Sequence, residues 1–410
     1  MPWPAAGSAA PRSGPPLVGS GASTSSSAAL EDFCRRTKVG AYGSVQLFID
    51  QSGNATAKLP LAALSVDHRP TDWLRLVAAV QAEEGTVALQ QVLVEASPVR
   101  AFGLRGGLLV LPLGLGNLQP EPTADLAVDR PLTDQLIIPT VWRELGAGVF
   151  GEVGPLRYQG AVLSGLDGSG FTPVAPLWGG RGDGTGLAIH DAAVVGRLEL
   201  ADTPRGLTIG VAGYVGGASH GIPDLSGVRA GVIEGDLRYH RRGFDIRAEY
   251  ARQYIVNSYL VNDYLGLLGQ SAVPARGRGF YVEIGYDLLR LAPIATKEAL
   301  QLFAAFENVN PRSVMSPYNY NLPAITGPGN LPPEAPSTSR SFVRAGLDYR
   351  PWPPVVLKAD IQIALDAVGV PGLPLQVAPG APGTPKTVST DIADAAAGAT
   401  RVGLAIGFSF

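Results

Sequence analysis

The sequence of 410 residues contains a single cysteine, few charged side chains and no long apolar run. With Cys34 alone, the chain can form neither an intrachain disulfide nor a zinc site built on cysteines. Charged residues make up 16% of the chain, below the roughly 25% of an average soluble domain. A net charge of −3 gives no electrostatic basis for binding nucleic acid. The apolar runs are shorter than the roughly 20 residues of a transmembrane helix, which excludes a helical membrane protein.

The N-terminal segment lacks the features of an export signal. Residues 1–29 are rich in Ala, Gly, Pro and Ser, without a basic start or a continuous apolar core. We therefore expect residues 1–38 to be disordered and of low complexity. If the chain is exported, either its start site is misassigned or its signal is atypical.

From residue 39 onward the apolar residues recur at every second position. In the final segment, for example, Val402, Leu404 and Ile406 alternate with Arg401 and Gly403. A period of two indicates β-strands with one apolar and one polar face. The pattern predicts sixteen strands, at 39–49, 60–68, 73–83, 86–96, 99–112, 142–152, 155–166, 190–201, 206–216, 229–240, 243–254, 278–290, 298–308, 340–350, 354–366 and 399–410.

The connections between these segments alternate in length. Short connections follow the even-numbered segments, and long ones follow the odd-numbered segments except at 84–85. Transmembrane barrels have this pattern, with short periplasmic turns and long outer loops. A soluble β-sandwich would share the alternating polarity but would not explain the alternating connections. The fold class that we predict is all-β, a transmembrane antiparallel β-barrel of about 16 strands over residues 39–410.

Aromatic residues support this prediction because several lie near the ends of predicted strands. In membrane barrels such residues form girdles at the two interfaces, although aromatics are also frequent in ordinary strands. The residues are Trp142, Tyr158, Tyr239, Tyr250, Tyr286, Tyr349 and Trp352.

Two features resemble known outer-membrane proteins. The alternating last strand ends in Phe408 and Phe410, which resembles the terminal signal read by the barrel-assembly machinery. The stretches Arg105–Leu118, Arg130–Ala147 and Gly148–Ser169 resemble the phosphate-selective porin O and P family. The resemblance is clearest over 99–170. It implies a sixteen-stranded barrel in the bacterial outer membrane, usually a trimer, whose third long loop folds inward and narrows the pore.

In this chain the third long connection is 113–141, and we expect it to form the pore constriction. Its acidic residues outnumber its basic residues by four to one. Such an excess predicts a filter for ions, whereas a solvated loop with incidental charges is the alternative. We expect neutralisation of Asp129 and Asp134 to shift permeability toward anions. The charged residues of the loop are Glu121, Asp125, Asp129, Arg130 and Asp134.

Charged residues also occur on the polar faces of the strands. Two interpretations are open: opposite charges on adjacent strands form ion pairs, as for Asp236 and Arg238 beside Arg247 and Glu249, or separate basic and acidic tracks create a transverse field. The chain has five lysines, so the basic lining of the anion-selective family members is missing and phosphate selectivity is not supported. The bases expected to face the lumen are Arg75, Arg157, Arg197, Arg238, Arg247, Arg344, Lys358 and Arg401. The acids are Glu199, Glu234, Asp236, Asp245, Glu249, Glu283, Asp348 and Asp360.

Together these patterns predict a porin that allows passive diffusion of small hydrophilic solutes or ions. A non-conducting barrel whose loops 309–339 and 367–398 bind a ligand or partner is the main alternative, and it is distinguished by a loop 113–141 that plugs the lumen. A barrel enzyme is the second alternative, but no catalytic motif is present. We expect no cofactor and no metal. The expected partners are outer-membrane lipid, the permeating solutes, the assembly machinery and two further copies in a homotrimer.

Overall fold

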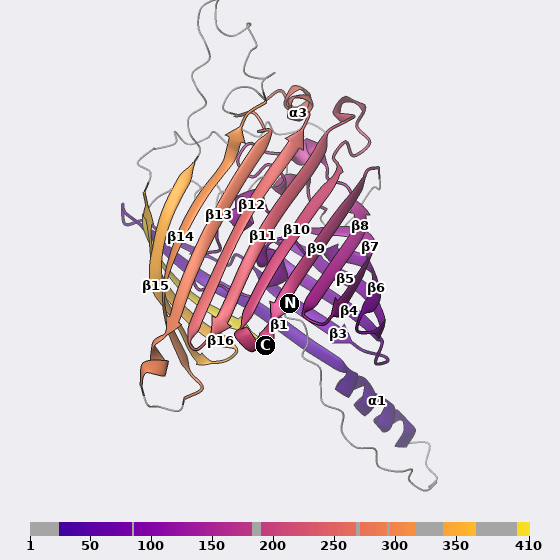
Figure 1. Cartoon of the computed structure of the whole chain (residues 1–410), viewed down its shortest axis with the longest axis vertical. Helices are drawn as coiled ribbons and strands as arrows, with labels where there is room; N and C mark the ends of the chain where they lie inside the picture. Colours follow the sequence, from indigo (N-terminus) through magenta and orange to yellow (C-terminus); the bar gives the residue numbers. More distant parts are fainter. Residues whose placement is uncertain are drawn as a thin grey trace, which may run out of the picture.

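The structure, a computed structural model, describes residues 24–83, 86–182, 190–267, 271–292, 296–316, 339–365 and 400–410. Its strands form one sheet (Figure 1), in which consecutive strands pair with each other except β2 and β3, and the last strand pairs with the first. The strands are β1 (Thr37–Asp50), β2 (Ala55–Lys58), β3 (Ala62–His68), β4 (Leu74–Glu83), β5 (Thr86–Val99), β6 (Phe102–Val110), β7 (Arg143–Val153), β8 (Leu156–Ser164), β9 (Ala192–Asp202), β10 (Leu207–Gly217), β11 (Arg229–Arg241), β12 (Phe244–Val256), β13 (Arg276–Asp287), β14 (Ala299–Val314), β15 (Arg340–Trp352), β16 (Val355–Ala364) and β17 (Arg401–Ser409).

The short helices lie in the connections between strands and before β1. The α-helices are α1 (Thr24–Arg36), α2 (Leu115–Leu118) and α3 (Ser258–Leu265), and η1 (Thr133–Ile137) is a π-helix. The 3₁₀ turns are η2 (Gly168–Gly170), η3 (Trp178–Gly180), η4 (Thr203–Arg205), η5 (Pro223–Leu225) and η7 (Leu288–Leu291). Every helix among the described residues is too short or too polar to span a membrane.

The sheet is a closed barrel because β1 pairs antiparallel with β17 from Tyr42–Ser409 to Asp50–Arg401. The other side of β1 pairs with β2 near one end and with β3 near the other, so β2 and β3 are two parts of one strand. Counting them as one strand gives a sixteen-stranded antiparallel barrel, as the period predicts. Strand β2 is not predicted, because it lies within residues 50–59, which read as a long connection, and the predicted strand 60–68 corresponds to β3 alone.

The barrel is apolar outside and polar inside. In β12, Asp245, Arg247 and Glu249 are buried on the inner face, whereas Phe244 and Tyr250 on the outer face are 43% and 45% exposed. The other strands repeat this alternation because successive side chains of a strand point to opposite faces. Closure leaves no unpaired sheet edge, and an apolar exterior matches a lipid environment. The architecture is therefore that of a membrane-spanning barrel.

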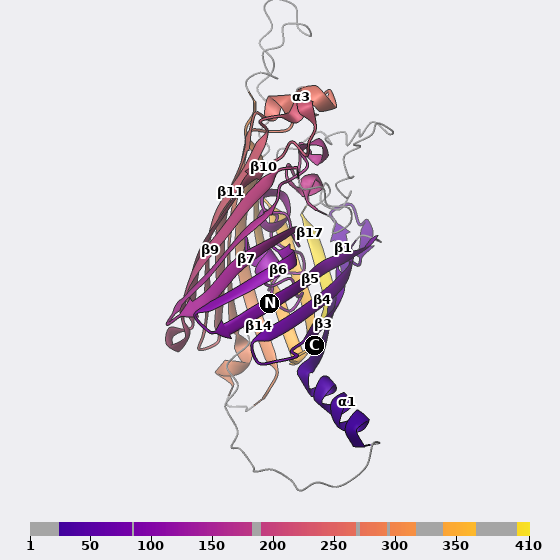
Figure 2. The same cartoon turned by 90° about the vertical axis from the view of Figure 1, so that its right-hand side faces the viewer.

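The two ends of the barrel differ as the connection lengths predict. One end has short turns such as 100–101, 154–155 and 242–243, and the other end has long loops such as 111–142. Helix α1 and the C-terminus lie at the turn end, and α3 lies at the loop end (Figures 1 and 2). Helix α1 covers residues that we expected to be disordered, and β1 begins at Thr37 rather than at residue 39. Residues 1–23, all of the predicted loop 367–398 and most of the predicted loop 309–339 lie outside the described residues.

The loop end is closed on one side by a shared apolar cluster. Leu113 and Ile137 of the connection 111–142 pack there with Phe171, Leu225 and Val261 of three other loops. Trp142 belongs to this cluster, with its ring 4.6 Å from that of Tyr214. The expectation that Trp142 is a girdle residue is therefore wrong. A residue at the start of a strand can face the loop cluster instead of the lipid.

Candidate functional site

The connection 111–142, which we call the lumen loop, runs inside the barrel between β6 and β7. Its entry requires a glycine, because Gly114 has a φ of +79° and a Cβ there would lie 3.0 Å from Asp134 Oδ1. At its return, Asn117 donates to the carbonyls of Leu113 and Pro139 and accepts a hydrogen bond from Trp142 N. These contacts fold the lumen loop back on itself within the barrel.

Carboxylates of the wall hold the backbone N–H groups of the lumen loop. Gly114 N donates to Glu234 at 3.2 Å, and Leu115 N donates to Glu249 at 2.7 Å. At the other end of the loop, Thr133 N donates to Glu307 at 2.8 Å. Helix α2 and helix η1 are thereby attached to β11, β12 and β14. Hydrogen bonds to a charged acceptor are stronger than those between neutral groups.

Cations of the wall hold the carbonyl groups of the same loop. Lys358 Nζ donates to the carbonyls of Pro122, Asp125 and Ala127 at 2.6, 2.7 and 3.0 Å. Arg344 donates to the carbonyl of Asp129 at 3.2 Å. The predicted wall residue Lys358 therefore fastens the lumen loop to β16, and three carbonyl oxygens surround its charge.

The acidic side chains of the lumen loop pair with arginines of the wall. Asp129 Oδ2 lies 2.8 Å from Arg401 Nη2, and Asp125 Oδ1 lies 3.4 Å from Arg247 Nη1. Arg130 Nε of the loop itself lies 3.8 Å from Asp125. Much of the acidic excess of the loop is thus neutralised by the barrel. The charge count of the loop alone overstates the negative charge inside the lumen.

Val128 contacts both ends of the barrel sheet. Its N–H donates to Asp360 of β16 at 2.7 Å, and its carbonyl accepts from Gln46 Nε2 of β1 at 2.7 Å. Its side chain packs with Phe48 of β1 and Ala405 of β17. One residue of the lumen loop therefore reaches the first strand and the last two strands.

Ion pairs also line the wall away from the loop. Arg197 contacts Glu234 at 2.8 Å and Asp236 at 2.6 Å, and Arg157 contacts Glu199 at 3.0 Å. Of the two interpretations of the wall charges, the structure shows ion pairs. The predicted wall residues on the inner face are Arg75, Arg157, Arg197, Arg238, Arg247, Glu249, Arg344, Lys358, Asp360 and Arg401.

The pairing that we expected between β11 and β12 is wrong in its register. Asp236 lies opposite Glu249, and Arg238 lies opposite Arg247, so like charges face each other. The opposite charges come from elsewhere, because Asp236 pairs with Arg197 of β9 and Arg238 pairs with Glu199 of β9. Strand β10 lies between β9 and β11, so these ion pairs cross it. Gly210 of β10 has no side chain, and this leaves room for Arg197 to reach Asp236.

Asp134 and Glu121 do not line the cavity that lies between the lumen loop and strands β1, β16 and β17. Asp134 is 3% exposed and accepts a hydrogen bond from Tyr281 Oη at 3.3 Å. Burial raises the pKa of Asp134 to about 7, and the charges of Asp125 and Glu307 act in the same direction. The expectation that Asp134 lines the constriction is therefore wrong, since its carboxyl is enclosed between loop and wall.

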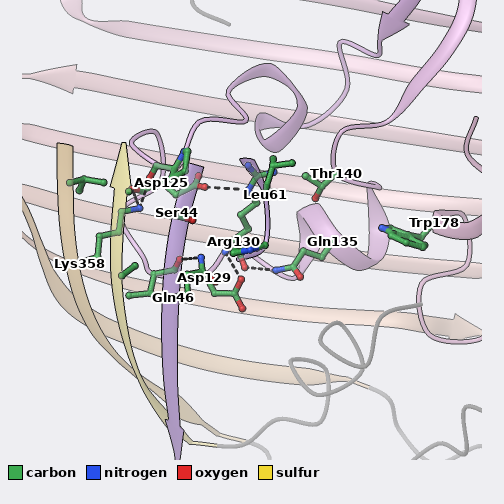
Figure 3. A pocket seen from close by; sticks show the side chains of 16 residues that line it. Ser44, Gln46, Leu61, Asp125, Asp129, Arg130, Gln135, Thr140, Trp178 and Lys358 are labelled. Carbon is green, nitrogen blue, oxygen red and sulfur yellow. Dashed lines mark hydrogen bonds and ion pairs between the residues drawn. The ribbon is translucent and has the colours of Figure 1, made fainter. Parts of the chain in front are cut away.

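A cavity open to solvent lies between the lumen loop and strands β1, β16 and β17 (Figure 3). Three of the predicted loop residues line it, namely Asp125, Asp129 and Arg130. Gln135 donates to the Arg130 carbonyl at 2.8 Å beside them. Trp178 lies at the far side of the cavity in Figure 3. The cavity is thus bounded by six separate parts of the chain, since Pro60 and Leu61 also line it.

Sequence reasoning missed several residues of this cavity: Ser44, Gln46, Gln135, Thr140 and Trp178. Ser44 and Gln46 are the polar positions of the alternating strand 39–49, so the period could have identified them. The other three lie in irregular connections, where the sequence carries no comparable signal. Among the described residues, no cluster of His, Cys, Asp and Glu could hold a metal ion. The site offers polar groups and space, which suits passage of solutes.

Solved structures with the same fold are outer-membrane porins. The Salmonella typhi OmpF complex with daunomycin has a TM-score of 0.55 at 9% identity, over 91% of this chain and 97% of that chain. Pseudomonas putida OprB has a TM-score of 0.53 at 11% identity, over 95% and 97%. An anion-selective porin from Comamonas acidovorans has a TM-score of 0.51 at 11% identity, over 91% and 100%. The fold is that of the outer-membrane porins. At these identities the likeness is one of fold.

The sequence comparisons are less informative. No family model matches the chain, so the resemblance to the phosphate-selective porin O and P family stays a prediction. An uncharacterized protein of Aquifex aeolicus (strain VF5) is 28% identical over 291 residues, which are 68% of this chain and 62% of that protein. The chain therefore spans 62% of the length of this curated relative.

Proposed function

We propose that this protein is an outer-membrane porin through which small hydrophilic solutes and ions diffuse passively. The observation that carries the proposal is the polar cavity between the lumen loop and β1, β16 and β17, inside a barrel with an apolar exterior. The lumen loop is held by β11, β12 and β14 on one side and by β1, β16 and β17 on the other, and the cavity is the space left open beside the second set of contacts. The lumen loop sets the size limit for solutes.

Ion selectivity of this pore is weak. The charged residues that line the cavity are Asp125, Asp129, Arg130 and Lys358, so two acids balance two bases. Asp129 is further paired with Arg401, and Lys358 is surrounded by three carbonyls. Because the cavity has no excess of cations, we do not extend the proposal to phosphate selectivity.

The first experiment is single-channel conductance of the refolded protein in a planar bilayer. Stepwise openings are expected, with a reversal potential near zero in a salt gradient. A folded protein without openings would contradict the proposal and favour the alternative, a barrel whose loops bind a ligand or partner.

A cysteine placed in the cavity tests the route itself. In a Cys34→Ser background, Ser44→Cys introduces a thiol at the cavity lining, and a bulky cationic thiol reagent should lower the conductance. Ser52→Cys is the matched control, because Ser52 lies in the exposed turn between β1 and β2. Equal effects of the reagent on both variants would show that solutes do not pass this cavity.

Assembly and location form the remaining part of the proposal. We infer that the protein assembles as a homotrimer in the bacterial outer membrane and carries out no chemical step. Phe408 and Phe410 act as the signal for the barrel-assembly machinery. Phe410 is 70% exposed, and its rings stack with Phe408 at 6.1 Å, which leaves an accessible aromatic end. Light scattering of the detergent-solubilised protein tests the trimer.

A further inference from the structure

Three arginines of β12 and β13 stand on the outer face of the barrel at its loop end. Arg252 lies near the end of β12, and Arg276 and Arg278 lie at the start of β13. They alternate with buried inner-face residues such as Gln253 and Gly277, so their side chains point away from the lumen. We call Arg252, Arg276 and Arg278 the arginine row. Strands β12 and β13 cross the front of Figure 1, below α3.

The register places two of these charges directly against each other. Arg252 is the cross-strand partner of Arg278, and Tyr254 is the partner of Arg276. Like charges at directly opposed positions destabilise a sheet. The ring of Tyr254 lies 5.1 Å from the Arg252 guanidinium and 5.9 Å from that of Arg276. The tyrosine therefore holds two guanidinium groups in place but supplies no negative charge.

Among the described residues, no acid supplies a counterion to the arginine row. The acids of the flanking strands, such as Glu249, Glu283 and Glu307, are buried on the inner face. Within the part of the chain that the structure describes, no carboxylate forms an ion pair with Arg252, Arg276 or Arg278. Arg252 Nε is buried without a hydrogen-bond partner. Within the described part of the chain, the row therefore has one unsatisfied buried donor and no opposing carboxylate.

The position of the arginine row relative to the aromatic residues of the outer face indicates its level in the membrane. The next outward pair toward the turn end is Tyr250 opposite Phe280, and the rings of Phe280 and Phe306 lie 5.7 Å apart. On the outer face, the pair Arg252–Arg278 is thus followed directly by the aromatic pair Tyr250–Phe280. Aromatic side chains at such a boundary mark the level where lipid tails meet headgroups. The arginine row stands at headgroup level.

We propose that the arginine row binds the phosphate of an anionic lipid headgroup in the leaflet at the loop end. Guanidinium groups bind phosphate oxygens through paired N–H donors, and an anion between Arg252 and Arg278 removes their repulsion. The headgroup phosphate contacts the exposed guanidinium groups of Arg276 and Arg278 beside Arg252, while the acyl chains lie along Phe280 and Phe306. A soluble phosphate ion has the same charge but gains nothing from these rings. The proposal requires a membrane-embedded barrel but not an open pore.

The test compares two lipids on the refolded full chain in a nonionic detergent. Dioleoylphosphatidylglycerol or dioleoylphosphatidylcholine is titrated, and the apparent affinity follows from the rise of the unfolding temperature. We expect wild type to bind the anionic lipid at least about tenfold more tightly, a factor that corresponds to about 1.4 kcal/mol. Arg252→Gln/Arg278→Gln should lose this preference. Arg241→Gln/Arg242→Gln removes the same charge from the exposed β11–β12 turn at the opposite end and should keep it.

The difference in unfolding temperature between the double variant and wild type should change sign when anionic lipid is added. This distinguishes a lipid site from a general loss of stability. Without anionic lipid, Arg252→Gln/Arg278→Gln should unfold at a higher temperature than wild type, because a like-charge pair is gone. With saturating phosphatidylglycerol the order should reverse. If the double variant does not refold, Arg278→Gln alone removes the pair and carries the same expectation.

Three results would overturn the proposal. These are equal binding of the two lipids by wild type, an unchanged preference in the double variant, and loss of the preference when inorganic phosphate is added at the same concentration. The last result would assign the row to free phosphate. Conductance of the same preparations is a separate readout, so failure of the lipid site and failure of the pore are distinguishable.

Discussion

Asp129 and Asp134 belong to the same loop and have the same side chain, but their surroundings differ. Asp129 lines the cavity and pairs with Arg401 at 2.8 Å. Asp134 is enclosed and faces Tyr281. The two carboxyls therefore have different consequences for permeation and for stability, and they can be separated by mutation.

Asp129→Asn leaves the Arg401 guanidinium without its carboxylate beside the cavity. The permeability ratio should shift toward anions by about twofold or more, because an unbalanced charge in a narrow passage concentrates counterions. Reversal potentials in a salt gradient measure the ratio. Asp134→Asn is the matched control and should leave the ratio unchanged. Equal shifts in the two variants would contradict the assignment of Asp129 alone to the passage.

Asp134 also predicts a dependence of stability on pH. Its pKa is about 7 in the folded protein, against about 3.9 in an unfolded chain. Between these values the folded protein retains a proton that the unfolded chain releases, so the free energy of unfolding falls as the pH rises from about 4 to about 7. Unfolding in urea at several pH values should show a smaller decrease in Asp134→Asn than in wild type. Glu121→Gln, which removes another acid of the lumen loop, should retain the full decrease.

At the level of elements, the lumen loop is attached mainly through its backbone. The wall carboxylates Glu234, Glu249 and Glu307 accept from its N–H groups, and Lys358 and Arg344 donate to its carbonyls. Attachment by backbone groups tolerates changes in the side chains of the loop. The wall residues therefore determine where the loop lies.

Lys358→Met removes the donor of three carbonyl contacts and should weaken docking of the lumen loop by roughly 3 kcal/mol. We expect a larger and noisier single-channel conductance, since the loop segment from Pro122 to Ala127 is released from β16. Lys297→Met is the control, because it removes the same charge from an exposed position at the turn end. A conductance trace of Lys358→Met that matches the control would show that this lysine does not position the loop.

The strands were predictable because their period of two is a local property of the sequence. The residue that lies opposite each position on the neighbouring strand was not predictable. The alternation of Val402, Leu404 and Ile406 places β17 and its faces without further information. The opposition of Asp236 to Glu249 depends on the register, which the turn 242–243 sets and composition does not reveal. Helix α1 was missed because its sequence is rich in serine and alanine and resembles the preceding low-complexity segment. The cavity was only partly predictable, because Trp178 and Gln135 enter it from irregular segments.

At the level of the whole molecule, the barrel reverses the usual distribution of polarity. Adjacent residues of one strand illustrate the difference: Val45 of β1 is 57% exposed on the outer face, and Ser44 is 5% exposed and lines the cavity. The same charge should therefore have opposite consequences at these two neighbouring positions.

Val45→Arg places a charge in the lipid near the middle of β1 and should lower the free energy of unfolding by about 2–4 kcal/mol. Ser44→Arg places the charge in the aqueous lumen, so the protein should fold with near wild-type stability and show reduced conductance. Urea unfolding in lipid vesicles measures both stabilities. A soluble sandwich would give the reverse order, with the inward arginine the more damaging change.

The contacts of Val128 have a consequence for the order in which the chain assembles. The pairing of β1 with β17 joins the two ends of the sequence, so it is the contact with the greatest loop-closure entropy and forms late. Val128 already binds Gln46 on one side of this seam and Asp360 on the other. We therefore expect the lumen loop, besides narrowing the pore, to help hold the first and last strands in register when the barrel closes. The narrowing of the pore and the closure of the barrel are two results of one docking event, and a chain with a shortened lumen loop would gain width at the expense of its yield of closed barrels.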